Sequence, residues 1–136
     1  MKWYIGIRTA QGAHVWVEED GVRSPLKHLV FLSPTGMEWG YGGSGPADLA
    51  MSLIADAAPE YAYEGQRPAV DPGIYMGFKR DIVIFLPRDG WRISAQDIRR
   101  WIEVWLSDDG EDAARRHAIV QVHPLLAEGG IEGEPE

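Results

Sequence analysis

Cysteine is absent from the 136 residues of the sequence. Without a thiol the protein can form neither a disulfide nor a thiolate metal site, and it has no cysteine nucleophile. Basic residues are also scarce, because 13 Lys and Arg stand against 21 Asp and Glu and leave a net charge of -8. No basic stripe is available to neutralise phosphates, so we expect no direct binding to nucleic acid.

Long hydrophobic runs are missing as well. Residues 1–8 alternate in the manner of a β-strand and do not contain the apolar core of a signal peptide. No stretch of the sequence is long enough to span a bilayer. We therefore expect a cytoplasmic protein without a membrane partner.

The negative charge is concentrated toward the C-terminal end. Residues 107–136 carry a balance of -6, whereas residues 1–106 carry only -2. Solvated tail charge is a commoner cause of such a pattern than an acidic face that mimics nucleic acid. Residues 127–136, rich in Gly and Glu, are predicted to be a disordered acidic tail. Residues 1–126 are then the right length for a single domain.

The sequence does contain enough apolar residues to form a hydrophobic core. Apolar residues make up 45% of the chain and include six Trp. Residues 3–9 and 14–18 are predicted strands, joined by a short Gly-containing link that favours an antiparallel hairpin. The apolar run 29–32 is predicted to be a third strand. In the first strand, Trp3, Ile5 and Ile7 share one face, and Tyr4, Gly6 and Arg8 share the other.

The fold class that follows is α+β, a small antiparallel sheet from an N-terminal β-hairpin packed against about three helices. Helical spacing of apolar residues predicts these helices over 46–57, 74–86 and 94–106. The last of the three is the best defined, because Ser94 and Asp97 form a short capping box. Its apolar face is formed by Ile98, Trp101, Ile102 and Trp105.

The helix over 46–57 has recognisable start signals. Pro46 suits the first helical turn, because its missing N–H is not needed there. Ser44 or Gly45 is expected to cap the helix, and Asp48 to place negative charge near the positive end of its dipole.

Two segments allow alternative structures. The helix over 74–86 competes with a buried strand over 81–86, and the aromatic spacing that begins at Tyr75 favours the helix. Near the C-terminus, a strand over 117–123 competes with a helix over 112–120. Residues 59–73, between the first two helices, are predicted to be a long surface loop.

Glycines cluster in the segment 39–46, immediately before a predicted helix, where backbone N–H groups can converge on an anion. Gly40, Gly42 and Gly45 match the dinucleotide-binding fingerprint by spacing, but no βαβ unit follows them. The Lys-Ser/Thr pair of a P-loop is missing, and Pro46 stands where a nucleophile elbow needs Gly.

No catalytic residue, metal site or cofactor is therefore predicted. The four His residues lack metal-ligand spacing, and the acids at 108–112 lack the calcium-loop pattern. The glycine segment is more simply explained as a tight turn, anchored by Trp39 and Tyr41, in which glycines such as Gly43 supply positive φ. If it is instead a contact surface, the candidate binding residues, with two tyrosines of the 59–73 loop, are Trp39, Tyr41, Gly42, Gly43, Ser44, Gly45, Tyr61 and Tyr63.

The run Glu38-Trp39-Gly40-Tyr41-Gly42-Gly43-Ser44-Gly45-Pro46, followed by Leu49-Ala50, resembles the WGYGGSGPxxLA signature of a family of unknown function from bacteria and phages. The resemblance covers most of the body and omits the tail. It implies a compact accessory protein, often of mobile-element origin, and it implies no activity, mechanism or catalytic residue.

Two functional hypotheses follow. The leading hypothesis is a non-enzymatic interaction protein that binds another macromolecule, most simply a protein, and a host factor if the gene belongs to a phage. Tyr and Trp are enriched in interface hot spots, and both occur in the glycine segment. The alternative is a small-molecule or nucleotide-binding domain, or an enzyme, that uses the backbone donors at 40–45. The partner's identity and the oligomeric state are not predicted.

Overall fold

The computed structural model describes residues 1–107 and 112–125, which form an α+β fold around one antiparallel sheet. The strands follow the order β3-β2-β1-β4-β5 across the sheet. They are β1 (Lys2–Thr9), β2 (Gly12–Glu19), β3 (Val22–Pro25), β4 (Gly90–Ser94) and β5 (His123–Pro124). The helical segments are α1 (Ser44–Ala57), α2 (Pro72–Asp81), α3 (Ala95–Leu106), α4 (Ala113–Ile119) and the 3-10 turns η1 (Pro59–Tyr61) and η2 (Val83–Phe85).

The N-terminal hairpin is confirmed, and so is the separation of its two faces. Tyr4 pairs with Val17 on one side and with Ile93 on the other, and all three side chains belong to the buried core. Ile5 pairs with Trp16 on the opposite face. Alternation along β1 therefore sends one set of side chains toward the helices and the other set away from them.

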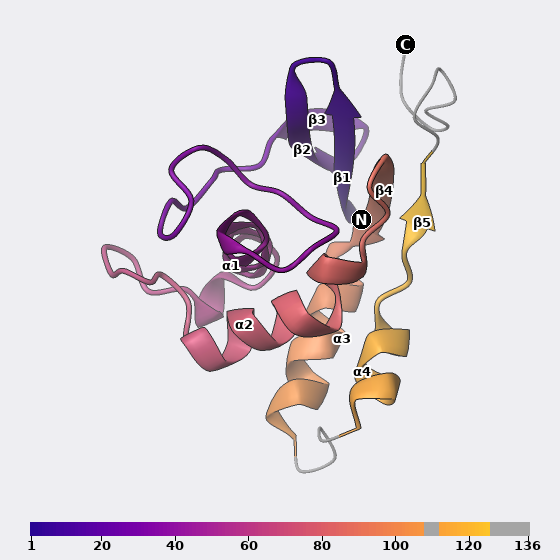
Figure 1. The fold of residues 1–136 in the computed structure, drawn as a ribbon. Helices are drawn as coiled ribbons and strands as arrows, with labels where there is room; N and C mark the ends of the chain where they lie inside the picture. The colour runs from indigo at the N-terminus through magenta and orange to yellow at the C-terminus, as the bar shows by residue number, and fades with distance from the viewer. Residues whose placement is uncertain (108–111, 126–136) are drawn as a thin grey trace.

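Helices pack against the core-facing side of this sheet. Figure 1 shows α1 end-on beside the sheet and α2, α3 and α4 below it. The helix α3 contacts β1 and β4, while α1 is joined to β1 by the Tyr4 hydroxyl, which donates to Asp56 Oδ2 at 2.6 Å. Burial raises the pKa of Tyr4, and this hydrogen bond raises it further. Three tryptophans are fully buried in the core: Trp39, Trp91 and Trp101.

The third strand is not where the sequence predicted it. The strand β3 lies at Val22–Pro25, and the apolar run 29–32 is irregular. The backbone N–H groups at 29 and 31–33 donate to side chains of α1 instead of to a neighbouring strand. The prediction for 29–32 was wrong because those donors found side-chain acceptors on a helix that is distant in sequence.

The helix predicted over 46–57 begins two residues earlier, at Ser44, and Gly43 is its N-cap without a side-chain hydrogen bond. The expected cap by Ser44 or Gly45 is therefore wrong. The expected dipole role of Asp48 is also wrong, because Asp48 lies beyond the first turn and its carboxylate accepts hydrogen bonds from residues 31–33.

The helix predicted over 74–86 is shorter than expected. The helix α2 starts after an Asp71 cap and stops at Asp81, and the turn η2 follows. The strand alternative over 81–86 is wrong, and Phe85, in η2, is 62% exposed. In contrast, α3 is confirmed with its Ser94 cap, whose Oγ accepts from Asp97 N at 3.1 Å.

Two other segments carry more structure than predicted. Residues 59–73 contain η1 and an isolated bridge between Ala62 and Val70, and the sequence missed β4 altogether. Near the C-terminus, the helix alternative is confirmed by α4, and the strand β5 has two residues. The predicted tail at 127–136 lies outside the described residues. None of the described helices has both the length and the apolar character that a membrane span requires.

Candidate functional site

Trp39, the first aromatic residue of the glycine segment, is part of the core. Its side chain is fully buried, and its indole Nε1 donates to the carbonyl oxygens of Pro87 and Arg88 at 3.0 and 3.1 Å. The ring meets Trp91 edge-on, with 5.4 Å between ring centroids. These contacts fix the segment against the loop before β4, so Trp39 is a structural anchor.

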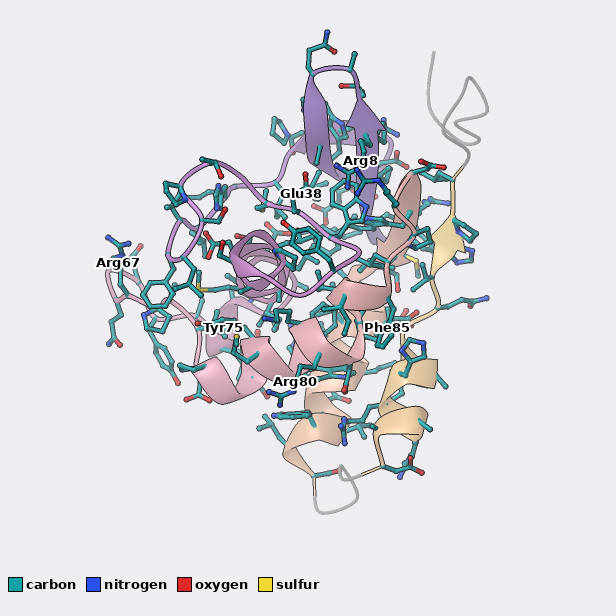
Figure 2. All side chains as sticks on the ribbon, in the orientation of Figure 1. Arg8, Glu38, Arg67, Tyr75, Arg80 and Phe85 are labelled. Carbon is teal, nitrogen blue, oxygen red and sulfur yellow. The ribbon has the colours of Figure 1, made fainter. Side chains whose placement is uncertain are left out.

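An ion pair covers the same ring. Arg8 on β1 donates to both carboxylate oxygens of Glu38, at 2.8 and 3.0 Å, and its guanidinium lies 4.8 Å from the Trp39 ring centroid. Figure 2 shows the two labelled side chains next to β1. The hydrogen bonds from Arg8 lower the pKa of Glu38 in spite of its partial burial. The Arg8 guanidinium is thus already engaged by a carboxylate.

The glycines of the turn have different structural roles. Gly40 has φ of +88°, the left-handed region that favours glycine, whereas Gly43 has φ of -178° and is extended. The prediction of positive φ at Gly43 is therefore wrong. At Gly45 the requirement is space, because an added Cβ would lie 2.9 Å from Glu38 Cβ.

A polar hollow of about 330 Å³ lies beside this turn and the start of α1. Tyr41, Ser44 and Gly45 line it together with Glu38. Among its described lining residues there is no Lys, Arg or His. A helix N-terminus attracts anions. Here, however, no cationic side chain of the described residues lines the hollow, and the Glu38 carboxylate does. The geometry gives little support to a phosphate site at the glycine turn.

A larger, mainly apolar cavity of about 640 Å³ lies elsewhere, between the segments 27–31 and 59–69. We call it the loop groove. Figure 2 places Arg67, which lies in its second wall, on the side of the molecule away from Arg8 and Glu38. The lining residues are Lys27, His28, Leu29, Val30, Phe31, Met51, Pro59, Ala62, Tyr63, Glu64, Gly65, Gln66, Arg67, Pro68 and Ala69.

The first wall of the loop groove is tied to α1 by one buried carboxylate. Asp48 accepts backbone N–H bonds from Phe31, Leu32 and Ser33 at 2.9 to 3.1 Å. It also lies 2.9 Å from His28 Nε2. Burial alone would raise the pKa of Asp48, but these donors outweigh it and the pKa is lowered. The wall is therefore held by a charged, fully partnered anchor.

The second wall, in residues 59–69, contains a loop whose two ends are hydrogen-bonded to each other. Ala62 and Val70 form an antiparallel bridge, and Tyr63 N donates to Ala69 O at 2.6 Å. Val70 is fully buried, so the base of this loop is fixed in the core. Arg67, near the tip, lies 5.9 Å from the ring centroid of Phe31 on the opposite wall. The two walls thus face each other from segments about thirty positions apart in the chain.

Apolar side chains remain open to solvent at the loop groove. Val30 is 46% exposed and Tyr63 is 49% exposed, one on each wall. Lys27 and Arg67 form no ion pair with any residue that the structure describes. The surface therefore offers apolar contact area edged by uncommitted positive charge.

The structure does not bring all of the candidate binding residues predicted from the sequence to one place. Trp39 is buried, whereas Tyr41 is 49% exposed and, with Ser44 and Gly45, lines the polar hollow. Gly42 and Gly43 belong to the same turn. Of the two loop tyrosines, Tyr63 lines the loop groove, and Tyr61 is partly buried against the core.

The first wall of the loop groove was missed by sequence reasoning. Its apolar run at 29–32 was assigned to a strand, although the adjacent Lys27 and His28 interrupt a strand pattern. Exposure of Val30 follows from the hydrogen bonds to Asp48 and Ser52, which join distant segments. Local periodicity contains no signal for them.

A buried polar cluster lies apart from both cavities. The Asp81 carboxylate accepts from Trp101 Nε1 at 2.9 Å and from Arg116 Nε at 2.7 Å. His117 Nδ1 lies 2.7 Å from the Asp81 carbonyl oxygen. The cluster joins α2, α3 and α4 and its charges compensate each other, so it is a structural network.

Comparison with known families places the chain. The sequence profile of a family of unknown function (DUF6166) matches residues 4–104, well over half of the chain. The resemblance to a family of unknown function that the glycine segment indicated is thereby confirmed. No curated protein and no solved structure matches the chain.

Proposed function

The chain belongs to this family of unknown function, and from that premise we propose that it is a non-enzymatic interaction protein that binds a protein partner in the loop groove. One observation carries the proposal: exposed Val30 and Tyr63 face a mainly apolar cavity of about 640 Å³ from two independently fastened walls. A cavity of this size accommodates a few side chains of a partner.

The fastening of the walls supports binding without rearrangement. Asp48 holds the first wall, and the bridge between Ala62 and Val70 holds the second. Walls that are already ordered lose little conformational entropy when a partner binds, which favours affinity. Tyr63 contributes a large amphipathic ring of the type enriched in hot spots.

The hydrogen bonds also indicate the mode of recognition. The N–H groups of residues 29 and 31–33 are already engaged by Ser52 and Asp48. The N–H groups of Leu29 and Phe31, which line the groove, are therefore not available to an incoming strand, and this disfavours the addition of a β-strand at these positions. Recognition through side chains in the groove is the mode that these hydrogen bonds support.

The setting that we propose is the cytoplasm, with a host protein as partner if the gene belongs to a phage or another mobile element. The acidic composition and the absence of a basic stripe support a protein partner over nucleic acid.

A paired capture experiment tests the proposal. Tagged wild-type protein is compared with the double variant Val30→Asp/Tyr63→Asp and with Val22→Asp in extracts of the native host. Val22 is 70% exposed on β3 and does not line the groove, which makes it a matched control. We expect a protein that is retained by the wild type and the control and lost by the groove variant.

The captured protein is then purified, and its affinity for the three forms is measured by calorimetry. A decrease in affinity of more than about tenfold in the groove variant alone supports the proposal. Equal affinity for all three forms would place the binding surface elsewhere and overturn it.

A further inference from the structure

We infer that the segment bound in the loop groove carries an acidic residue next to a bulky apolar side chain. The inference rests on the proposed function, since it specifies the partner that the groove accepts. The observation behind it is an excess of uncommitted positive charge in a protein whose net charge is -8.

The two cations come from opposite walls. Lys27 precedes the first wall and Arg67 lies in the second, and both line the groove. Neither is paired with a carboxylate in the described part of the chain, whereas Lys2, Arg8 and Arg99 each are. An unpaired cation on each side of an apolar cavity is electrostatically complementary to an anion bound between them.

The other charges of the lining do not cancel this excess. Glu64 is the one carboxylate among the described lining residues, and against Lys27 and Arg67 it leaves a net charge of +1. His28 lies against Asp48, whose carboxylate is fully occupied by His28 and the N–H groups of residues 31–33. Asp48 is therefore not available to neutralise Lys27 or Arg67.

Arg67 is also positioned to bind a carboxylate beside an apolar group. Its side chain is exposed, and its guanidinium lies 5.9 Å from the ring centroid of Phe31, on the apolar wall. A guanidinium at this position can donate two parallel N–H bonds to one carboxylate. Phe31 and Val30 then contact the apolar neighbour of that acid.

Selection from random peptides tests the inference with a defined probe. Displayed 12-residue peptides are selected on three immobilised forms of the full chain: the wild type, Val30→Asp/Tyr63→Asp, and Lys27→Glu/Arg67→Glu. Enriched peptides are synthesised and their dissociation constants measured by fluorescence polarisation. Each form is first shown by circular dichroism to have the wild-type fold and melting temperature.

We expect the wild type to enrich peptides in which Asp or Glu adjoins Leu, Ile, Phe, Tyr or Trp. Changing that acid to its amide should weaken peptide binding roughly threefold to tenfold, because the amide carries no charge to attract Lys27 and Arg67. The charge-reversed form should no longer bind these peptides and should enrich others with Lys or Arg. If charge reversal perturbs the fold, Lys27→Met/Arg67→Met replaces it, because this pair keeps apolar stems and removes the charge.

The outcomes separate the inference from the proposed function. Peptides that need Val30 and Tyr63 but show no preference for an acid would overturn the inference and leave the groove as a binding site. If every peptide that the wild type enriches is also bound by the groove variant, both the inference and the proposed function fail.

Discussion

Asp48 Oδ2 lies 2.9 Å from His28 Nε2, and this contact joins the buried face of helix α1 to the wall of the loop groove. The same carboxylate accepts three backbone N–H bonds from residues 31–33. One side chain of α1 therefore fixes the backbone of residues 31–33, which precede the helix in the sequence. The shape of the groove depends on this anchor.

Replacement of Asp48 by Asn tests the anchor. The amide keeps one acceptor but places N–H groups against backbone donors, and removing a hydrogen bond to a charged group costs roughly 1.5–3 kcal/mol. We expect Asp48→Asn to lower the free energy of unfolding by roughly 2–4 kcal/mol in urea titrations. Asp89→Asn, at an exposed carboxylate, is the control and should change it little. Equal stability of the two variants would contradict the anchoring role.

The lowered pKa of Asp48 predicts how the stabilisation by this carboxylate depends on pH. The hydrogen bonds to Asp48 stabilise its charged form in the folded protein and are missing in the unfolded chain, so the pKa of Asp48 is lower in the folded state. The stabilisation is then fully present above the pKa of an unfolded Asp, about 3.9, and is lost as the pH falls through the folded pKa. We expect the stability difference between wild type and Asp48→Asn to shrink as the pH falls below about 4. A difference that grows on acidification would give the opposite sign and refute the assignment.

Trp101 should be among the most sensitive core positions. It is fully buried, stacks on Trp105 with 5.1 Å between centroids, and donates to Asp81. We expect Trp101→Ala to cost roughly 3–5 kcal/mol, a large share of the stability of a small domain. Trp101→Phe keeps much of the ring and removes the donor, so thermal and urea unfolding should show an intermediate loss of stability. A melting temperature unchanged in the alanine variant would show that the ring does not contribute to the core.

The glycine turn makes an internal comparison possible. Gly40→Ala places a Cβ at φ of +88° and should cost about 1–2 kcal/mol. Gly43→Ala meets only the half-exposed Tyr41 ring, at 2.8 Å, and that side chain can move away. We expect a loss of stability below about 1 kcal/mol for Gly43→Ala, from the replacement of Gly by Ala at the N-cap of α1.

Ser44→Ala is the matched control for this pair, because Ser44 caps no helix end. Urea unfolding of the three variants should rank Gly40→Ala as the least stable. The reverse order for Gly40→Ala and Gly43→Ala would mean that close packing against Tyr41, and not backbone conformation, limits the turn.

Local periodicity was sufficient to predict the hairpin of β1 and β2 and the helix α3. In β1 the two faces follow directly from alternation, and in α3 the Ser94 cap and the buried Trp101 follow from spacing alone. These features depend on residues that are close in the chain. The α+β class follows from the same information.

Other features were decided by residues far apart in the chain. The strand β4 is only five residues long, and its pairing with β1 brings Trp91 opposite Gly6, where an added Cβ would lie 2.2 Å from the Trp91 ring. Nothing in the local sequence indicates that position 6 requires glycine, because the requirement comes from the packing of Trp91 on Gly6. The loop groove has the same origin, because the hydrogen bonds of residues 31–33 to Asp48 and of Leu29 to Ser52 hold the wall at 27–31 against α1, where no strand forms.

The sequence by itself therefore determined the class of the fold, the hairpin and the best-marked helix of this protein. Only the tertiary structure decided that Gly6 must be a glycine, that Phe85 is exposed, and where an apolar surface stays open. The physical reason is that propensity, capping and periodicity act within a few residues, whereas burial and backbone satisfaction depend on which distant segments come together.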